Sequence, residues 1–147
     1  FNIYGFCEQE YEHKLKKLEE KNILKYHGLV NNIPSVLEGT HCLIHPTYYP
    51  EGMSNVLLEA AASARPVITT DRPGCKEIVE NGKTGFVINE KDSKDLIKKI
   101  EKFLSLSYEE KAEMGNNARE KVEKEFDRKI VISKYLNILN SILKKDD

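Results

Sequence analysis

The chain has 147 residues, a length that suits one domain of ordinary size. Its 23 Lys and Arg residues nearly balance its 24 Asp and Glu residues, so the net charge of -1 creates no field that would draw the chain onto nucleic acid. Hydrophobic residues make up 39% of the sequence, which is enough for a core, and the 8 Gly and 5 Pro are too few for a low-complexity chain. We therefore expect a globular protein without a nucleic-acid partner.

The cysteines and the termini bear on the compartment. Cys7, Cys42 and Cys75 are widely spaced and form no Cys-x-x-Cys pair, which predicts buried free thiols in a reducing cytosol. No apolar run reaches the roughly 18 residues that span a bilayer, and the N-terminus lacks the layout of a signal peptide. Because residues 1–6 open directly in an apolar run without an initiator Met, we expect a fragment of a longer protein.

Apolar runs alternate with amphipathic segments along the first 90 residues. In chain order they predict a strand at 1–6, a helix at 10–21, a strand at 23–30, a short helix at 33–39, a strand at 42–46, a helix at 54–64 and strands at 66–70 and 85–88. Buried strands separated by helices are typical of a parallel sheet covered on both faces. We therefore expect an α/β fold with a Rossmann-like, doubly wound parallel sheet of about five strands.

From residue 93 onward the pattern is helical, which predicts extra C-terminal helices. An amphipathic helix begins at residue 93, and Ser107 with Glu110 has the spacing of a capping box for the next one. The Lys- and Glu-rich stretch at 108–129 predicts a solvated helix face. The last helix, at 128–144, is too apolar on one side to stay exposed, so we expect it to dock on the sheet or on a domain outside this chain.

The predicted helix at 54–64 carries one charge, Glu59, among apolar residues on nearly every side. Such a pattern predicts a helix that is packed on most of its faces. A buried carboxylate is costly unless it is hydrogen-bonded or paired, so Glu59 requires a partner. That partner is either a ligand hydroxyl or a structural group, namely backbone N–H groups or an arginine.

Glu51 lies eight residues before Glu59, in a loop that joins the end of a predicted strand to a helix N-terminus. Ligands of open α/β sheets bind at such loops. The free N–H groups of the helix favour an anion there, and Gly52 lets the backbone approach it closely. Two glutamates separated by about the length of a diphosphate suit a nucleotide sugar. The loop matches neither a dinucleotide-binding fingerprint nor a P-loop.

Residues 45–60, which read HPTYYPEGMSNVLLEA, resemble the E-x7-E signature of retaining glycosyltransferases of family 4. The likeness continues through RPVITTD at 65–71, then Gly74, the Glu-Ile-Val run at 77–79 and Gly82, to Gly85-Phe86. The rest of the chain, to about residue 105, is similar to the family's C-terminal nucleotide-binding domain more loosely.

This resemblance implies the GT-B architecture, in which two Rossmann-like domains face each other across a cleft. Residues 1–147 would then be the C-terminal donor-binding domain. The N-terminal acceptor domain and the first strand–helix unit, with its phosphate-binding Arg and Lys, would lie outside the chain. By the resemblance Glu51 contacts the donor sugar as the catalytic residue and Glu59 binds the ribose. The other implied donor contacts are Gly52, Met53, Ser54, Asn55 and Val56 at the diphosphate, and Gly28 and Val30 at the base. No metal is expected, because fixed N–H groups and cationic side chains stabilise the leaving diphosphate.

The implied function is transfer of a sugar from a nucleoside diphosphate sugar to a saccharide or lipid-linked acceptor, with retention, in bacterial capsule, lipopolysaccharide or exopolysaccharide synthesis. The enzyme would be a hexosyl- or N-acetylhexosaminyl-transferase of the cytoplasm, peripheral at the inner face of the membrane through the absent domain, and the fragment alone would be inactive. Two other interpretations stay open. One is a non-catalytic nucleotide-sugar-binding or assembly module, and the other is a doubly wound domain whose two glutamates are structural.

Overall fold

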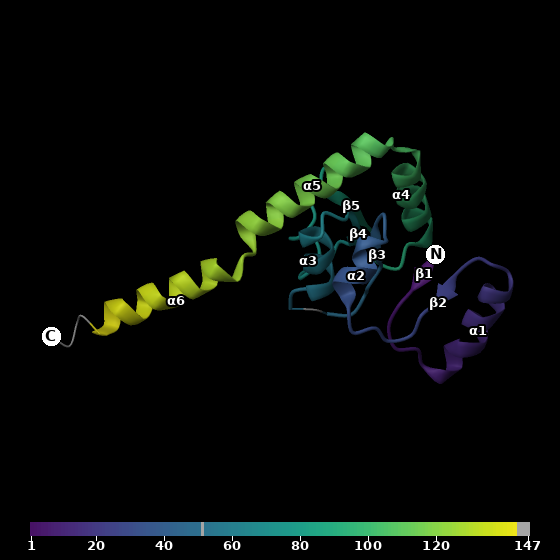
Figure 1. Cartoon of the computed structure of the whole chain (residues 1–147), viewed down its shortest axis with the longest axis horizontal. Coiled ribbons are helices and arrows are strands. Elements are labelled where there is room, and N and C mark those ends of the chain that lie inside the picture. The colour runs from purple at the N-terminus through teal and green to yellow at the C-terminus, as the bar shows by residue number, and fades with distance from the viewer. Residues whose placement is uncertain (51, 144–147) are drawn as a thin grey trace. The chain divides into compact units, whose positions relative to one another are not determined.

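The computed structural model describes residues 1–50 and 52–143, which are shown in Figure 1. The chain divides into two compact units, residues 1–36 and residues 37–147. Each unit has its own parallel strand pairing.

The first unit contains a short parallel sheet and a helix. Strands β1 (Asn2–Ile3) and β2 (Lys25–Tyr26) pair in parallel, and α1 (Gln9–Glu20) connects them. β2 is shorter than the strand predicted at 23–30. Gly28 takes a φ of 67°, a left-handed conformation that ends an extended run and favours glycine. Its carbonyl accepts the N–H of Gly5 at 2.8 Å, which joins the chain after β2 to the chain after β1.

The second unit is built around three parallel strands, β3 (Leu43–His45), β4 (Val67–Thr70) and β5 (Gly85–Ile88), in that spatial order. The short helix α2 (Ile33–Glu38) precedes β3, and α3 (Asn55–Ala62) leads from β3 to β4. Figure 1 shows α3 on one side of this sheet and α4 (Ser93–Ser105) on the other. The predicted α/β fold with parallel strands is confirmed, although hydrogen bonding divides the five strands into two sheets where one was predicted.

A hydrophobic core cluster of the second unit lies on the side of the sheet that α4 covers. Ile44, Ile68 and Phe86 are paired across β3, β4 and β5, so their side chains share one face. Phe103 of α4 packs against this face. The cluster contains Ile68, Phe86, Ile88, Phe103 and Met114, with Cys42, Ile44, Leu96, Ile100 and Leu106 packed partly buried against it. Burying these side chains supplies the hydrophobic stabilisation that holds the strands in register.

Helix α5 (Tyr108–Glu125) begins with the predicted capping box, in which the Ser107 hydroxyl accepts the Glu110 N–H and the Glu110 carboxylate accepts the Ser107 N–H. The predicted solvated face of α5 is confirmed, because its Glu and Arg side chains are exposed, but a second face of the helix is buried. Met114, Gly115, Ala118 and Val122 recur at helical spacing and are buried. The small residues among them admit close packing against α3, which charge counting along the stretch does not reveal.

The C-terminus of α3 ends in a left-handed residue. Ala64 has a φ of 53°. The N–H of Ala64 donates to the Ala61 carbonyl, and the N–H of Arg65 donates to the Ala60 carbonyl, each at 2.9 Å. These two bonds form a Schellman motif, whose left-handed position usually holds glycine.

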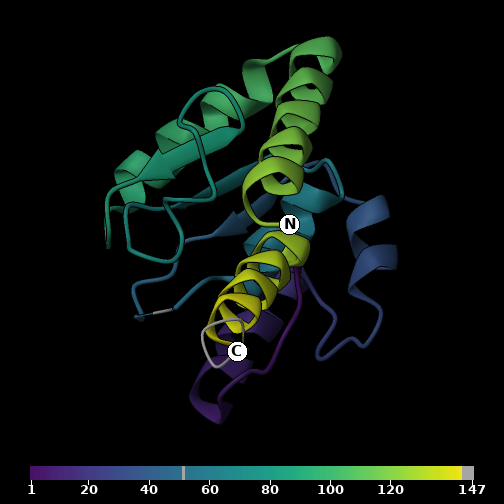
Figure 2. The ribbon, with the colours of Figure 1, turned by 90° about the vertical axis from the view of Figure 1, so that its left-hand side faces the viewer.

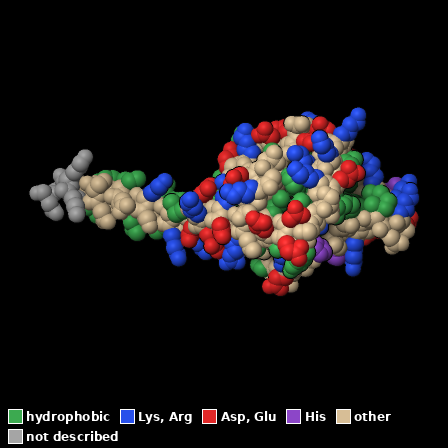
Figure 3. All heavy atoms as spheres, turned by 90° about the horizontal axis from the view of Figure 1, so that it is seen from above, with side chains coloured by type: hydrophobic (Ala, Val, Ile, Leu, Met, Phe, Trp, Pro, Cys, Tyr) green, Lys and Arg blue, Asp and Glu red, His purple; other side chains and the backbone are tan. Residues whose placement is uncertain are grey.

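Helix α6 (Arg128–Leu143) follows α5 after a short break in the helix (Figure 1 and Figure 2). It has no buried residue, so the expected docking of this helix on the sheet is not observed. Hydrophobic side chains cover part of its surface (Figure 3). Those more than half exposed are Val131, Ile132, Tyr135, Leu136, Ile138, Leu139, Ile142 and Leu143. Among the described residues, no helix is both long and apolar enough to span a bilayer.

Candidate functional site

The loop between β3 and α3, residues 46–54, lies at the edge of the sheet where sequence reasoning expects a ligand. Since β3, β4 and β5 are parallel, their carboxyl ends meet at this edge, and the segments that follow them start there. Ligands of open parallel sheets bind outside this edge. The loop leads directly into the N-terminus of α3.

The N-terminus of α3 is open to an incoming anion. Its N-cap residue, Ser54, is 2% exposed and makes no side-chain capping bond, so the free N–H groups of the first turn are not satisfied by that hydroxyl. Gly52, Met53 and Asn55 are exposed and Val56 is half-buried. A Cβ built on Gly52 meets no atom within 4 Å, so the space beside this residue is free for a ligand. Backbone N–H groups and the helix dipole favour a phosphate at such a position.

Glu59 is exposed, which overturns the sequence-based reason for giving it a ligand. The inference treated α3 as packed on most sides, whereas burial is confined to Leu57, Ala60 and Ala61. The exposed residues of α3 are Asn55, Glu59 and Ala62, and Val56 and Leu58 are half-buried. Glu59 lies four residues after Asn55, which is also exposed, so the two share one side of the helix. The Glu59 carboxylate is therefore available to a ligand. Because it is already in contact with water, it does not need a ligand to compensate for burial.

The remaining predicted site residues are Glu51, Gly28 and Val30. Glu51 lies outside the described residues. Gly28 and Val30 belong to the first unit, where Gly28 follows the carboxyl end of β2. Their predicted contact with the base of a nucleotide stays a prediction.

Polar side chains that sequence reasoning did not single out hold both ends of the β3–α3 loop. At its start, the Thr69 hydroxyl donates to the His45 carbonyl at 3.0 Å and the Thr70 hydroxyl donates to the Thr47 carbonyl at 2.6 Å. At its end, the Ser54 N–H donates to the Gly74 carbonyl at 2.9 Å. The signal in the sequence was two adjacent threonines at the end of an otherwise apolar strand.

The turn that contains Gly74 is itself held by the Glu77 side chain. The Glu77 carboxylate accepts the Gly74 N–H at 2.8 Å. Gly74 is buried and has a φ of 87°, a conformation that favours glycine. The turn after β4 is thereby closed and presents its carbonyl to α3.

A pocket of about 210 Å³ adjoins the β3–α3 loop at the same edge of the sheet. Tyr48 forms one wall and stacks on Tyr49 with ring centroids 4.5 Å apart. The Lys91 ammonium lies 4.9 Å from the centroid of the Tyr48 ring. Its described lining is Pro46, Tyr48, Thr70, Ile88, Asn89, Lys91, Asp92, Ser93 and Leu96. Both tyrosines are exposed beside the loop, so they are placed to contact a ligand held there.

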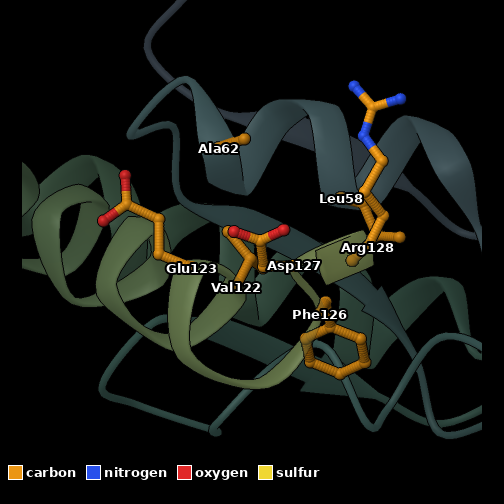
Figure 4. Close-up of a pocket in the computed structure, with 7 residues that line it drawn as sticks. All are labelled: Leu58, Ala62, Val122, Glu123, Phe126, Asp127 and Arg128. Carbon is orange, nitrogen blue, oxygen red and sulfur yellow. The ribbon is translucent and has the colours of Figure 1, made fainter. Parts of the chain in front are cut away.

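A second pocket, of about 310 Å³, lies between α3, α5 and the turn into α6 (Figure 4). Figure 4 shows Leu58 and Ala62 of α3 across from Val122 and Phe126. None of its described lining residues belongs to the β3–α3 loop. Its described lining combines the apolar Leu58, Ala62, Val122 and Phe126 with the charged Glu123, Asp127 and Arg128.

The cysteines and histidines take no part in a metal centre among the described residues, where no cluster of three His, Cys, Asp or Glu side chains could hold an ion. Cys75 is buried, whereas Cys7 and Cys42 are half-buried. Burial raises the pKa of the Cys42 thiol to about 12, so it stays protonated and unreactive near neutral pH. His27 stacks on Tyr4 in the first unit.

Comparison with known proteins decides the family. The family model for glycosyl transferases group 1 matches residues 1–121. The chain belongs to glycosyl transferases group 1. It matches the solved structures of glycosyltransferases with the GT-B fold, which accounts for the parallel α/β architecture.

Among relatives of this group 1 domain is the capsular polysaccharide biosynthesis glycosyltransferase CapM of Staphylococcus aureus, 34% identical over 113 residues, or 77% of this chain and 29% of that protein. A mutant of S. aureus TarM solved with Fondaparinux, alpha-GlcNAc-glycerol and UDP is 28% identical, with a TM-score of 0.82 over 95% of this chain and 29% of that chain. Anabaena HepE solved with UDP-glucose shares the fold, with 24% identity and a TM-score of 0.81 over 95% of this chain and 40% of that chain. The chain thus spans about a third of the length of these proteins.

Proposed function

We propose that this chain is the donor-binding part of a retaining glycosyltransferase of family 4 that uses a nucleoside diphosphate sugar. The acceptor is a saccharide or a lipid-linked saccharide of a bacterial surface polysaccharide. Support comes from the group 1 family match and from a relative named for capsular polysaccharide synthesis. Two related structures hold UDP or UDP-glucose, which favours a uridine nucleotide as the donor.

The observation that carries the proposal is the open N-terminus of α3 at the carboxyl edge of the sheet. The Ser54 hydroxyl makes no cap there, and the space beside Gly52 is open. In this position the N–H groups of Gly52, Met53, Asn55 and Val56 donate to the diphosphate. They are fixed before the reaction, so they stabilise the negative charge that grows on the leaving diphosphate without reorganising.

The two glutamates lie on either side of this anion site along the chain. Glu59 is about 6 Å further along the helix axis than Asn55, at 1.5 Å per residue, and its exposed carboxylate accepts hydrogen bonds from the ribose hydroxyls. Glu51 orients the donor sugar through its hydroxyls, while the departing phosphate assists the attacking acceptor. The outcome is retention of configuration at the anomeric carbon.

A binding panel tests this function. We expect isothermal titration of the chain with UDP-, GDP- and ADP-sugars to give saturable binding for the uridine nucleotide and much weaker binding for the other two. Saturable binding of any one of these donors also distinguishes the chain from a doubly wound domain with structural glutamates. No binding by any of the three would contradict the proposal.

We further propose that α6 packs against the acceptor-binding domain predicted from the sequence. Eight apolar side chains of α6 are more than half exposed, and exposed apolar side chains gathered on one element mark a contact surface. The chain spans 29% of the length of CapM, so the relatives have further chain for such a domain.

Replacing Leu136 and Leu139 together by serine tests the role of α6. Both are 53% exposed, so we expect the free energy of unfolding of this chain to change by no more than about 0.5 kcal/mol. In a protein extended by the acceptor domain, the same pair of substitutions should lower the melting temperature and the rate of sugar transfer. Calorimetry of both proteins makes the comparison. A destabilised short chain would instead mean that α6 packs within the 147 residues.

A further inference from the structure

We infer that Thr70 and Glu77 are positioning residues, which hold the two ends of the β3–α3 loop and so set the geometry of the diphosphate site. The inference rests on the proposed function, because it assigns these residues a role in donor binding. Neither residue needs to touch the donor. Each acts through a hydrogen bond to the backbone of the loop or of the turn that anchors it.

Thr70 holds the start of the loop. It is 1% exposed, and its hydroxyl donates to the Thr47 carbonyl at 2.6 Å. A buried hydroxyl is costly unless it is paired, and valine would fill the same space with no polar group to satisfy. A threonine at the last position of β4 therefore serves the loop and not the core. Thr69 repeats the contact one residue earlier, at the His45 carbonyl.

Glu77 holds the end of the loop through Gly74. Its carboxylate accepts the Gly74 N–H at 2.8 Å, and the Gly74 carbonyl accepts the Ser54 N–H at 2.9 Å. Ser54 and Gly74 are both buried, so water cannot readily replace either bond. Because Ser54 is the N-cap of α3, moving the turn moves the first N–H groups of that helix.

These two tethers fix the chain at Thr47 and at Ser54. Because Ser54 is fixed, the N–H groups that follow Gly52 lose less freedom when a donor binds, which strengthens binding without any added contact. Loss of either tether should therefore change the free energy of donor binding more than it changes the free energy of unfolding.

The test compares two buried threonines in this chain. Thr70→Val removes the tether, whereas Thr84→Val removes an equally buried hydroxyl, which accepts the Glu80 N–H at 2.8 Å. Thr84 directly precedes β5, at the opposite edge of the sheet. We expect Thr70→Val to raise the dissociation constant for UDP-glucose about tenfold and Thr84→Val to change it less than about twofold.

Conservative variants separate positioning from general destabilisation. Thr70→Ser and Glu77→Gln keep a hydrogen-bonding group and should bind UDP-glucose nearly as well as the unmodified chain, whereas Glu77→Ala should bind it about tenfold more weakly. Thermal unfolding of every variant gives the stability change. Equal losses of affinity for Thr70→Val and Thr84→Val, or no loss for either, would overturn the inference while leaving the proposed function intact.

Hydrogen exchange tests the tethers without any nucleotide. The amides of residues 52–56 should exchange about tenfold faster in Thr70→Val than in Thr84→Val. Equal exchange in the two variants would overturn the inference. Failure of the unmodified chain to bind any nucleoside diphosphate sugar would instead reject the proposed function, and the exchange comparison would still decide whether Thr70 holds the loop.

Discussion

Replacing Glu59 by alanine should raise the dissociation constant for the nucleoside diphosphate sugar about 30-fold, because hydrogen bonds to a charged group contribute about 2 kcal/mol. Glu59 is exposed, so its removal leaves no cavity and no unpaired partner in the core. We expect the free energy of unfolding to stay within about 0.5 kcal/mol of the unmodified value. Isothermal titration with the preferred donor measures the change in affinity.

Two further variants make the Glu59 result specific. Glu59→Gln keeps one oxygen acceptor and should retain part of the affinity. Glu113→Ala removes an exposed carboxylate from α5 and changes the net charge by the same amount, so it controls for long-range electrostatics. If Glu59→Ala and Glu113→Ala bind the donor equally well, Glu59 has no contact with the ribose.

Replacing Gly115 by valine should lower the free energy of unfolding by about 3 kcal/mol, which is the largest stability effect we expect. Gly115 is buried on α5, and a Cβ at this position would overlap the backbone carbonyl oxygen of Ala64. A backbone atom cannot rotate away as a side chain can, so α5 must move off α3. Urea denaturation followed by circular dichroism measures the loss.

Asn116→Val is the matched control for this substitution. Asn116 is the next residue of α5 and is exposed, so valine there carries a similar helix propensity without the steric overlap. We expect a change within about 0.5 kcal/mol. Equal stability of the two valine variants would mean that α5 does not pack closely on α3.

Periodicity was sufficient to place the helices and strands. The apolar runs of β3, β4 and β5 and the Ser107 capping box are local patterns, so the sequence reveals them directly. The division into two sheets was not predicted, because strand pairing depends on backbone contacts distant in the sequence. The buried face of α5 was missed for a related reason, since alanine and glycine fill it in place of large apolar residues.

The β3–α3 loop was proposed as the site from the sequence. One of the two reasons, the expected burial of Glu59, was wrong. The E-x7-E pattern identified the β3–α3 loop, whereas the supposed burial of Glu59 did not hold. The supports of the loop, Thr70 and Glu77, could not be assigned from sequence alone. Their partners, Thr47 and Gly74, are backbone groups, which carry no sequence signature.

The most direct test of the central claim is to find which backbone amides respond when UDP-glucose binds the chain. Amide resonances assigned by NMR during a titration report each position separately. We predict the largest saturable shifts at Gly52, Met53, Ser54, Asn55 and Val56. Saturable binding with shifts confined to the pocket between α3 and α5, around Leu58 and Phe126, would contradict the account.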